Sequence, residues 1–388
     1  MTMISPKILL LSLAAAGTVA AAPLKCGFAD DKMPSCPGCL QAAAETGALD
    51  FWWNWKTTPE VDFFGIPEEI AKQVTESFVP MIWGNAAPTG GYGFLETQSY
   101  VMGFNEPDLY GPSCNGEWNP PAHGCKLGET RPATSAGWAP LFDPTRGSAQ
   151  APHGATWWQQ AVEQMTGPHR PRSFSAGVAP AIVSPSMAGD AKGTVSCVNV
   201  DPAQPNSIKI CHGWLREFKR SALEMQCTNF NGIGVNCWDV IDHIQIHAYA
   251  RTAAEVKKKV AGYYEEFKED FEGLNGRKKK TLWLTEVSMG SNDVAEIVPF
   301  VQDLMNSEDG LTNREKFGYV EKVSWFSSFS FPSFKIGEYE PREHEVWSSS
   351  LFFPYGQLSG VGQTFFHFCK QAAGSGRLLQ EESRHVLV

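Results

Sequence analysis

The sequence contains 388 residues, of which 42 are Asp or Glu and 32 are Lys or Arg, and its formal net charge is −10. This acidic balance leaves no electrostatic footprint for nucleic acid or for an anionic membrane surface, so it favours a neutral partner. Aromatic residues make up 12% of the chain and include 13 Trp. Because Trp and Tyr rings stack on sugar rings, the composition fits a saccharide-binding protein, although large cores also use Trp.

The first 21 residues have the layout of a secretory signal peptide. Lys7 precedes an apolar run at residues 8–16, and small residues follow at 17–22, which predicts cleavage near Ala21. A transmembrane anchor is the alternative, but the apolar run is far short of the roughly 20 residues needed to cross a bilayer. We therefore expect a secreted, extracellular protein.

The ten cysteines are all expected in the mature chain, and their even number suits up to five disulfides in an oxidising compartment. Cys36 and Cys39 have the spacing of a redox motif or of half a zinc site, but no second such pair exists. We expect structural disulfides instead. Plausible short-range pairs are Cys114 with Cys125, Cys197 with Cys211, and Cys227 with Cys237. Cys369 is expected to pair with one of Cys26, Cys36 and Cys39 and so to tie the chain ends together.

Strand-like and helical patterns alternate over residues 22–373, which are predicted to form one domain before a polar tail at 374–388. Glycine- and proline-rich stretches between them, including residues 184–206, are expected to be loops. The alternation predicts an α/β fold, a (β/α)8 barrel. Seven strands are legible, and a short third strand is expected between residues 83 and 100. The legible strands are residues 49–55, 78–83, 100–104, 173–178, 240–249, 281–287 and 323–329, and helical patterns lie at 67–76, 155–165, 212–227, 253–272 and 295–306.

Two of the predicted strands run directly into a glutamate. The apolar run at 100–104 leads into Glu106, and the run at 281–285 ends on Glu286. The end of an apolar run is a poor place for a merely solvated charge, and barrel enzymes build their active sites at the C-terminal ends of strands. With the expected third strand included, Glu106 follows strand 4 and Glu286 ends strand 7.

Six motifs lie at or near the ends of predicted strands, at residues 51–55, 78–83, 103–108, 246–249, 283–286 and 323–326. In this order, along residues 48–370, they resemble glycoside hydrolase family 128, the β-1,3-glucanases of the large clan of retaining (β/α)8 glycosidases. The resemblance implies that Glu106 is the acid/base and Glu286 the nucleophile, with Asn105, Tyr249 and Trp325 around the reacting sugar. We expect no cofactor and no metal. The chain departs from a compact family member in its many cysteines and in a long insert at 112–154.

Elementary chemistry supports these roles. A retaining glycosidase needs two carboxyl groups roughly 5–5.5 Å apart, one to attack the anomeric carbon and one to protonate the leaving oxygen and then activate water. The acid must keep its proton, and a carboxyl that faces an ionised neighbour has a raised pKa. Asn105, directly before Glu106, is placed to bind the sugar 2-OH.

The predicted strand at 240–249 has an unusual polar face. Alternation places His247 and Tyr249 on the same side of this strand as His243 and Gln245. His247 and Tyr249 are therefore candidates to orient the nucleophile. The alternative for His247 is a core histidine whose hydrogen bonds are made to the backbone.

Three tryptophans, Trp55, Trp83 and Trp325, fall late in their predicted strands. Each is a candidate to floor a sugar subsite, and each has core packing as its alternative. Trp325 is expected at the reacting sugar and the other two at more distant subsites.

Three functions remain open on the sequence. The first is a secreted, monomeric, retaining endo-β-1,3-glucanase that acts on β-1,3-glucan in the extracellular space or cell wall. The second keeps the chemistry but acts on another β-linked polysaccharide, such as mixed-linkage glucan or mannan. The third is a non-catalytic glucan-binding protein on the same fold.

Overall fold

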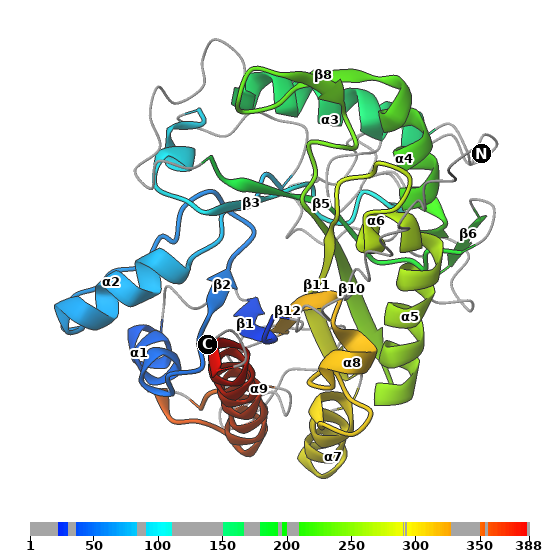
Figure 1. Cartoon of the computed structure of the whole chain (residues 1–388). Coiled ribbons are helices and arrows are strands. Elements are labelled where there is room, and N and C mark those ends of the chain that lie inside the picture. The colour runs from blue at the N-terminus through cyan, green and yellow to red at the C-terminus, as the bar shows by residue number, and fades with distance from the viewer. Residues whose placement is uncertain are drawn as a thin grey trace, which may run out of the picture.

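A computed structural model describes most of the chain outside the N-terminal segment (Figure 1). The predicted signal peptide, residues 112–149 of the insert with Cys114 and Cys125, and the predicted strand at 173–178 lie outside the described residues. The described residues are 22–29, 36–83, 91–110, 150–166, 179–192, 196–199, 209–289, 291, 293–326, 350–353 and 356–385.

Seven strands form one parallel sheet. Residues 78–82 lie between the two edge strands of this sheet, since Phe78 bridges to Trp52 and Met81 bridges to Met102. The ring therefore closes with this segment as its eighth member, and the (β/α)8 prediction is confirmed. The sheet order is β2 (Phe51–Trp53), β1 (Lys25–Ala29), β12 (Val320–Trp325), β11 (Thr281–Met289), β10 (His243–Ala250), β5 (Ala181–Met187) and β3 (Tyr100–Met102).

The helices lie outside the ring of strands (Figure 1). Helix α5 shows how local sequence sets a boundary: the Thr252 hydroxyl accepts the Glu255 N–H, and the Glu255 carboxylate accepts the Thr252 N–H. The helices are α1 (Pro37–Glu45), α2 (Glu68–Ser77), α3 (Gln150–Thr166), α4 (Trp214–Glu224), α5 (Ala253–Glu266), α6 (Lys268–Glu272), α7 (Val294–Met305), α8 (Arg314–Phe317) and α9 (Gly360–His385), with a 3-10 helix η2 (Gly93–Glu96).

One strand prediction is wrong in place, and a further strand, β5, was not recognised. The strand expected between residues 83 and 100 has no room there, because residues 78–82 bridge directly to β3, and the missing strand is β1, near the start of the described chain. The strand after Glu106 is β5, which includes part of a predicted loop. Ser184, Pro185 and Ser186 interrupt its apolar pattern and hide it. Glu106 still follows the fourth strand of the ring, because β1 supplies the missing one.

Alternation along the strands divides the core in two. Side chains that point outward, such as Ile244 and Ile246 of β10, join a large buried cluster that includes side chains of the helices. A smaller cluster fills the barrel interior and contains Trp53, Met102 and Trp283. Polar residues share that interior at both ends, so the polar face predicted for β10 is the barrel lining.

The N-terminal end of the barrel interior holds paired polar groups. His243 Nδ1 lies 3.2 Å from a Glu321 carboxylate oxygen, and Thr281 Oγ1 donates to the same oxygen at 2.7 Å. The Lys322 ammonium lies 3.5 Å from the centroid of the Tyr100 ring and 4.0 Å from that of Trp283. These contacts satisfy buried charges by pairing them with other groups.

Disulfides tie the ends of the chain, the start of helix α1 and one β-hairpin. The Cys26–Cys369 bond confirms the expected link between the C-terminal cysteine and the N-terminal group, and Cys227–Cys237 confirms a predicted short-range pair. Cys36 bonds to Cys39. Cys197 and Cys211 lie opposite each other in the antiparallel strands β6 (Ser196–Asn199) and β7 (Lys209–His212), which agrees with their predicted pairing. The remaining strands are β4 (Leu109–Tyr110), paired with β7, and the hairpin β8 (Gln226–Thr228) and β9 (Gly234–Asn236).

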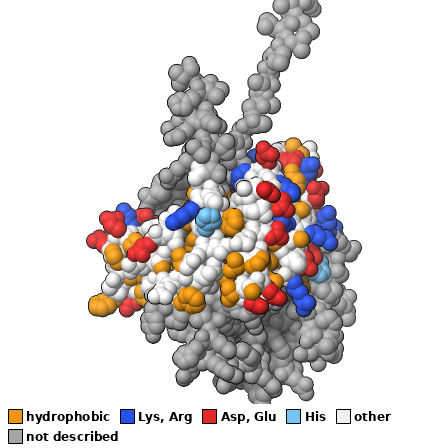
Figure 2. Space-filling view, turned by 90° about the horizontal axis from the view of Figure 1, so that it is seen from below, with side chains coloured by type: hydrophobic (Ala, Val, Ile, Leu, Met, Phe, Trp, Pro, Cys, Tyr) orange, Lys and Arg blue, Asp and Glu red, His pale blue; other side chains and the backbone are white. Residues whose placement is uncertain are grey.

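The surface of the barrel carries both signs of charge. On the face shown in Figure 2, acidic and basic side chains lie interspersed among hydrophobic ones. Within the described ranges, no helix is long and apolar enough to cross a membrane.

Candidate active site

Glu106 follows β3 in a backbone conformation that few residues adopt. Its φ is +43°, in the left-handed region. Its N–H donates to the Ser186 hydroxyl at 3.2 Å, and the preceding Asn105 N–H donates to the Trp83 carbonyl at 3.0 Å. A side chain at Gly103 would come within 2.9 Å of the β5 backbone, so glycine lets the two strands approach. These contacts direct Glu106 toward the barrel axis.

Glu286 lies on β11 and is buried, with 4% of its surface exposed. One carboxylate oxygen accepts the Trp55 indole N–H at 3.0 Å, and the other accepts the Tyr249 hydroxyl. Trp55 also has a left-handed backbone, with φ +60°. Two of the described non-glycine residues with positive φ are therefore in one site, where backbone strain is commonly tolerated for function.

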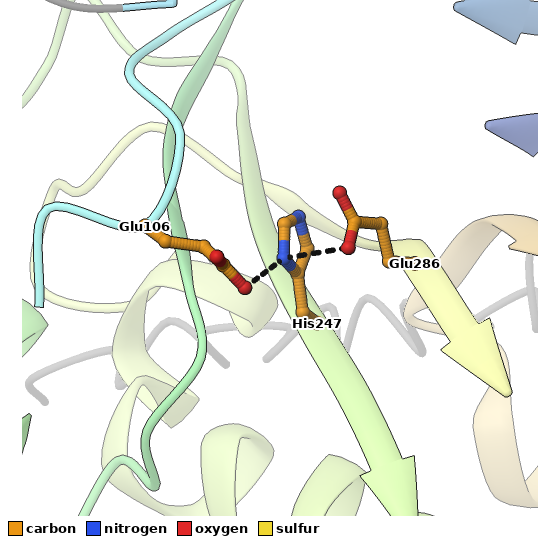
Figure 3. A group of neighbouring side chains, drawn as sticks. All are labelled: Glu106, His247 and Glu286. Carbon is orange, nitrogen blue, oxygen red and sulfur yellow. Dashed lines mark hydrogen bonds and ion pairs between the residues drawn. The ribbon is translucent and has the colours of Figure 1, made fainter. Parts of the chain in front are cut away.

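His247 lies between the two glutamates and has no exposed surface. Its Nδ1 is 2.7 Å from a Glu106 oxygen and 3.2 Å from a Glu286 oxygen (Figure 3). The three side chains each present one atom, and these atoms lie within 4.8 Å of one another. The structure thus brings together the two glutamates that the strand-end positions singled out, and adds His247 as the group that bridges them.

The electrostatics of this cluster follow from two carboxylates sharing one histidine. Burial raises the pKa of Glu286 to about 7, with the Glu106 charge acting in the same direction, against the lowering effects of His247, Tyr249 and Trp55. Burial lowers the pKa of His247, but the charges of Glu286 and Glu106 outweigh it and the net pKa is raised. The pair of Glu106 and Glu286 therefore retains a proton throughout the mildly acidic pH range.

Tyr249 is suited to act as a constant hydrogen-bond donor. Burial of its hydroxyl and the nearby Glu286 charge raise its pKa well above the ordinary value of 10.0, so the phenol stays protonated. The residue as a whole is still 48% exposed. Tyr249 can therefore hold Glu286 through its hydroxyl while part of its surface remains open to a ligand.

The same three side chains, Glu106, His247 and Glu286, are also close enough together to ligate a divalent cation. Coordination through His247 Nδ1 would put the ring proton on Nε2. That atom is buried and has no hydrogen-bond partner among the described residues, so the proton would be left unsatisfied. The hydrogen bond from Nδ1–H to Glu106 leaves no such donor, and we favour it over metal coordination.

The other predicted substrate residues fall into different settings. Trp55 contacts Glu286, and Trp83 is 37% exposed beside Asn105. Asn105 is only 6% exposed, and the Ser186 hydroxyl lies 3.4 Å from its side-chain oxygen. Contact of these residues with sugar stays a prediction.

The structure corrects the placement of Trp325. Its side chain is fully buried on the outside of the barrel, with ring centroids 6.2 Å from Phe300 of α7 and 5.9 Å from Phe365 of α9. The next residue, Phe326, instead packs edge-on against Trp55 and Tyr249. Successive residues of a strand face opposite sides, so an assignment one residue out moved the expected ring from the site to the core.

Sequence reasoning missed three residues of the site: Ser186, Phe326 and Asp108. Ser186 lies in the unrecognised β5, so no signal placed it near Glu106. Asp108 closes the motif that contains Glu106, and its spacing of two residues was an available clue. It is 1% exposed and accepts two backbone N–H groups of the chain after β5.

A cavity of about 810 Å³ lies between the residues that follow β5 and helix α5. Neither glutamate lines it, and Tyr249, which contacts Glu286, is the residue that it shares with the carboxylate cluster. Its lining includes Ala188, Asp190, Tyr249, Arg251 and Lys259.

The fold and the paired carboxylates define a barrel of the glycoside hydrolase class. The family model for the glycosyl hydrolase catalytic core matches residues 36–179 and 181–365, and the chain belongs to that family. No curated protein shows a significant match to the sequence.

Several solved structures are similar at low sequence identity. One is a family 128 (subgroup IV) endo-β-1,3-glucanase from Lentinula edodes, with 16% identity, a TM-score of 0.49, and coverage of 89% of this chain and 100% of the other. Another is a subgroup VI exo-β-1,3-glucanase from Aureobasidium namibiae, with 14% identity, a TM-score of 0.48, and coverage of 89% and 96%. A third is a subgroup VII oligosaccharide-binding protein from Trichoderma gamsii, with 16% identity, a TM-score of 0.44, and coverage of 90% and 94%.

Proposed function

We propose that the protein is a secreted, retaining endo-β-1,3-glucanase that cleaves β-1,3-glucan by double displacement. The observation that carries the proposal is the pair of carboxylates, Glu106 after β3 and Glu286 on β11, whose oxygens both lie within 3.2 Å of one histidine nitrogen. Separation on this scale suits direct attack by one carboxylate rather than attack by an intervening water. The β-1,3 linkage comes from the resemblance of the six strand-end motifs.

The hydrogen-bond partners support a division of roles between the two glutamates. The nucleophile must be charged, and Glu286 accepts from Trp55 and Tyr249 and lies 3.2 Å from His247 Nδ1. Among the described side chains, only His247 lies within hydrogen-bond distance of Glu106, so fewer groups hold its charge, and we propose it as the acid/base. Glu106 then protonates the leaving oxygen, and in the second step takes a proton from water.

Neutral glucan offers no charge to bind, so affinity must come from stacking and hydrogen bonds. The exposed parts of Trp83 and Tyr249, together with the cavity beside Tyr249, supply such surfaces. Cleavage within a chain, like the β-1,3 linkage, rests on the resemblance of the strand-end motifs. Secretion rests on the leader at residues 1–21 and agrees with the disulfides.

The test is hydrolysis of a panel containing β-1,3-glucan, mixed-linkage glucan and mannan. We expect oligosaccharides of several lengths from β-1,3-glucan early in the reaction, and proton NMR should show the β-anomer first. An α-anomer as first product would overturn the retaining mechanism, and release of monosaccharide alone would overturn endo action. Binding of β-1,3-glucan without hydrolysis would instead support the non-catalytic alternative.

A further inference from the structure

The two residues after β5, Ala188 and Gly189, are held on all of their backbone polar atoms by side chains from elsewhere. Asp108 accepts the Ala188 N–H at 3.1 Å and the Gly189 N–H at 2.6 Å. On the other side, the Lys259 ammonium donates to the Ala188 carbonyl, and the Tyr263 hydroxyl donates to the Gly189 carbonyl at 2.8 Å. The dipeptide is therefore a fixed point between the Glu106 segment and helix α5.

The Glu106 segment is tied to the β5 segment at two places. Ser186 donates its N–H to the Phe104 carbonyl at 2.7 Å, and its hydroxyl accepts the Glu106 N–H. Four residues beyond Phe104, Asp108 makes the second attachment. Glu106 lies between these attachments with its left-handed φ of +43°, a conformation that persists only where the surroundings enforce it.

We propose that Asp108 is a positioning residue that holds Glu106 in place for acid/base catalysis by anchoring its segment to Ala188 and Gly189. The proposal rests on the proposed function. Asp108 need not touch the substrate, and its full burial leaves little of it to do so. An ionised carboxylate suits this position because it accepts on both oxygens, whereas an amide of the same shape would turn one N–H donor toward another.

If Asp108 positions Glu106, its loss should affect only the steps that need acid/base catalysis. Glu106 protonates the leaving group and later activates water, whereas Glu286 is held by Trp55 and Tyr249 from other strands. Displacing Glu106 should therefore harm cleavage of a sugar–sugar bond, whose leaving group needs a proton. It should spare the first step with a 2,4-dinitrophenyl glycoside, whose leaving group needs none.

The experiment compares wild type, Asp108→Asn and Glu106→Ala on a β-1,3-gluco-oligosaccharide and on its 2,4-dinitrophenyl glycoside. For Asp108→Asn we expect kcat/KM on the oligosaccharide to fall by about 100-fold, the scale of a small misplacement of a catalytic group. On the aryl glycoside kcat/KM should change by less than about threefold, since that step needs no acid. Azide should raise aryl turnover and release the β-glycosyl azide, as for Glu106→Ala, because it attacks the glycosyl-enzyme without a base.

Asp270→Asn is the matched control. Asp270 is also fully buried and accepts the Trp238 indole N–H at 2.7 Å, but it lies on α6, away from the carboxylate pair. Its loss should lower the melting temperature and leave the ratio of the two kcat/KM values unchanged. If Asp108→Asn does not fold, Ser186→Ala removes the acceptor of the Glu106 N–H and must show the same dependence on the leaving group.

Equal losses on both substrates, with no effect of azide, would overturn the positioning role and leave Asp108 a structural residue. Equal losses on both substrates in Ser186→Ala would likewise overturn the positioning role. A wild-type protein that cleaves neither substrate would overturn the proposed function itself, and the role of Asp108 with it.

Discussion

Strand β10 carries two histidines on the same face, four residues apart, and they sit in opposite kinds of surroundings. At the N-terminal end of the barrel, His243 lies 3.2 Å from one carboxylate, that of Glu321. At the C-terminal end, His247 lies within 3.2 Å of two, those of Glu106 and Glu286. One end of the barrel pairs its charges, and the other leaves an excess of negative charge.

The pKa values of the two ends follow from this count. Burial alone would raise the pKa of Glu321, but the hydrogen bond and charge of His243 outweigh it and the pKa lies below its ordinary value. Burial raises the pKa of Glu286 to about 7, and the neighbouring Glu106 adds to it. The Glu321 network at the N-terminal end stabilises the fold. The cluster of Glu106, His247 and Glu286 at the C-terminal end keeps a labile proton and lowers stability, as catalytic sites commonly do.

The largest expected effect is the loss of hydrolysis when a carboxylate is removed at the C-terminal end of the barrel but not at the N-terminal end. Glu286→Ala should reduce hydrolysis by at least about 10⁴-fold, the scale seen when a nucleophile is removed, because no glycosyl-enzyme can form. Azide should restore turnover of the dinitrophenyl glycoside and give the inverted α-glycosyl azide. Glu321→Gln at the other end should leave kcat of the folded protein near wild type. Hydrolysis by Glu286→Ala at near-normal rates would remove Glu286 as the nucleophile.

The second expectation tests the boundary between core and site on β12. Trp325→Ala should lower the free energy of unfolding by about 3–5 kcal/mol, as for other buried aromatics, with kcat of the folded molecules unchanged. Phe326→Ala should do the reverse: a smaller stability loss and a clear fall in kcat, because Phe326 packs on Trp55 and Tyr249. Urea titration and kinetics on matched samples measure both. A Trp325→Ala variant that folds normally but has a low kcat would contradict the corrected placement.

Trp325 also shows where sequence reasoning stops. The strand itself was predictable from its apolar run, but the face of each residue depends on where the alternation begins, and one residue of error exchanges core and site. The strand β5 was missed for another reason: Ser184, Pro185 and Ser186 interrupt its pattern, since their packing against neighbouring strands is a tertiary property.

The positions of the two glutamates were predictable because each places a charge at the end of an apolar run. Such breaks in the local pattern are expected at functional sites. Their common partner was harder to find. The polar face of β10 pointed to His247 as a group that orients the nucleophile, but its shorter contact is to Glu106. Which of two neighbours a histidine favours depends on the register of β10 and β11, which has an irregularity between Ile246 and His247.

Stability should depend on pH with opposite sign at the two ends. Glu286 has an ordinary pKa of 4.5 and a folded pKa of about 7, so its ionisation is unfavourable in the folded state. Relative to Glu286→Gln, wild type should therefore lose roughly 3 kcal/mol of unfolding free energy as the pH rises from 4.5 to 7. No such change is expected above pH 7, where the group is charged in both states.

Glu321 should behave the other way. Its folded pKa lies below the ordinary 4.5, so the ionised carboxylate contributes stability above pH 4.5 that is lost as the pH falls through the folded pKa. At pH 7, Glu321→Gln should cost about 3 kcal/mol, the scale for breaking a buried pair, and the difference should shrink in acid. Thermal or urea unfolding at pH 3, 5 and 8 measures both variants. Parallel pH trends for the two would contradict the contrast between paired and excess charge.

The smallest expected effect concerns the Tyr249 hydroxyl, which donates to Glu286. Tyr249→Phe removes a single donor to Glu286 and leaves the ring, whose packing against Phe326 should be kept. A hydrogen bond to a charged group contributes about 1.5–3 kcal/mol, so kcat should fall by roughly 10- to 100-fold. The pKa of Tyr249 lies well above 10.0, so this loss should be uniform across the acidic and neutral range instead of following a titration. The loss should fall mainly in the deglycosylation step, since Glu286 starts that step as a neutral ester and regains its charge as it leaves the sugar. Pre-steady-state kinetics with the dinitrophenyl glycoside can separate the steps. A Tyr249→Phe variant with wild-type kcat in both steps would mean that Trp55 and His247 alone hold the nucleophile.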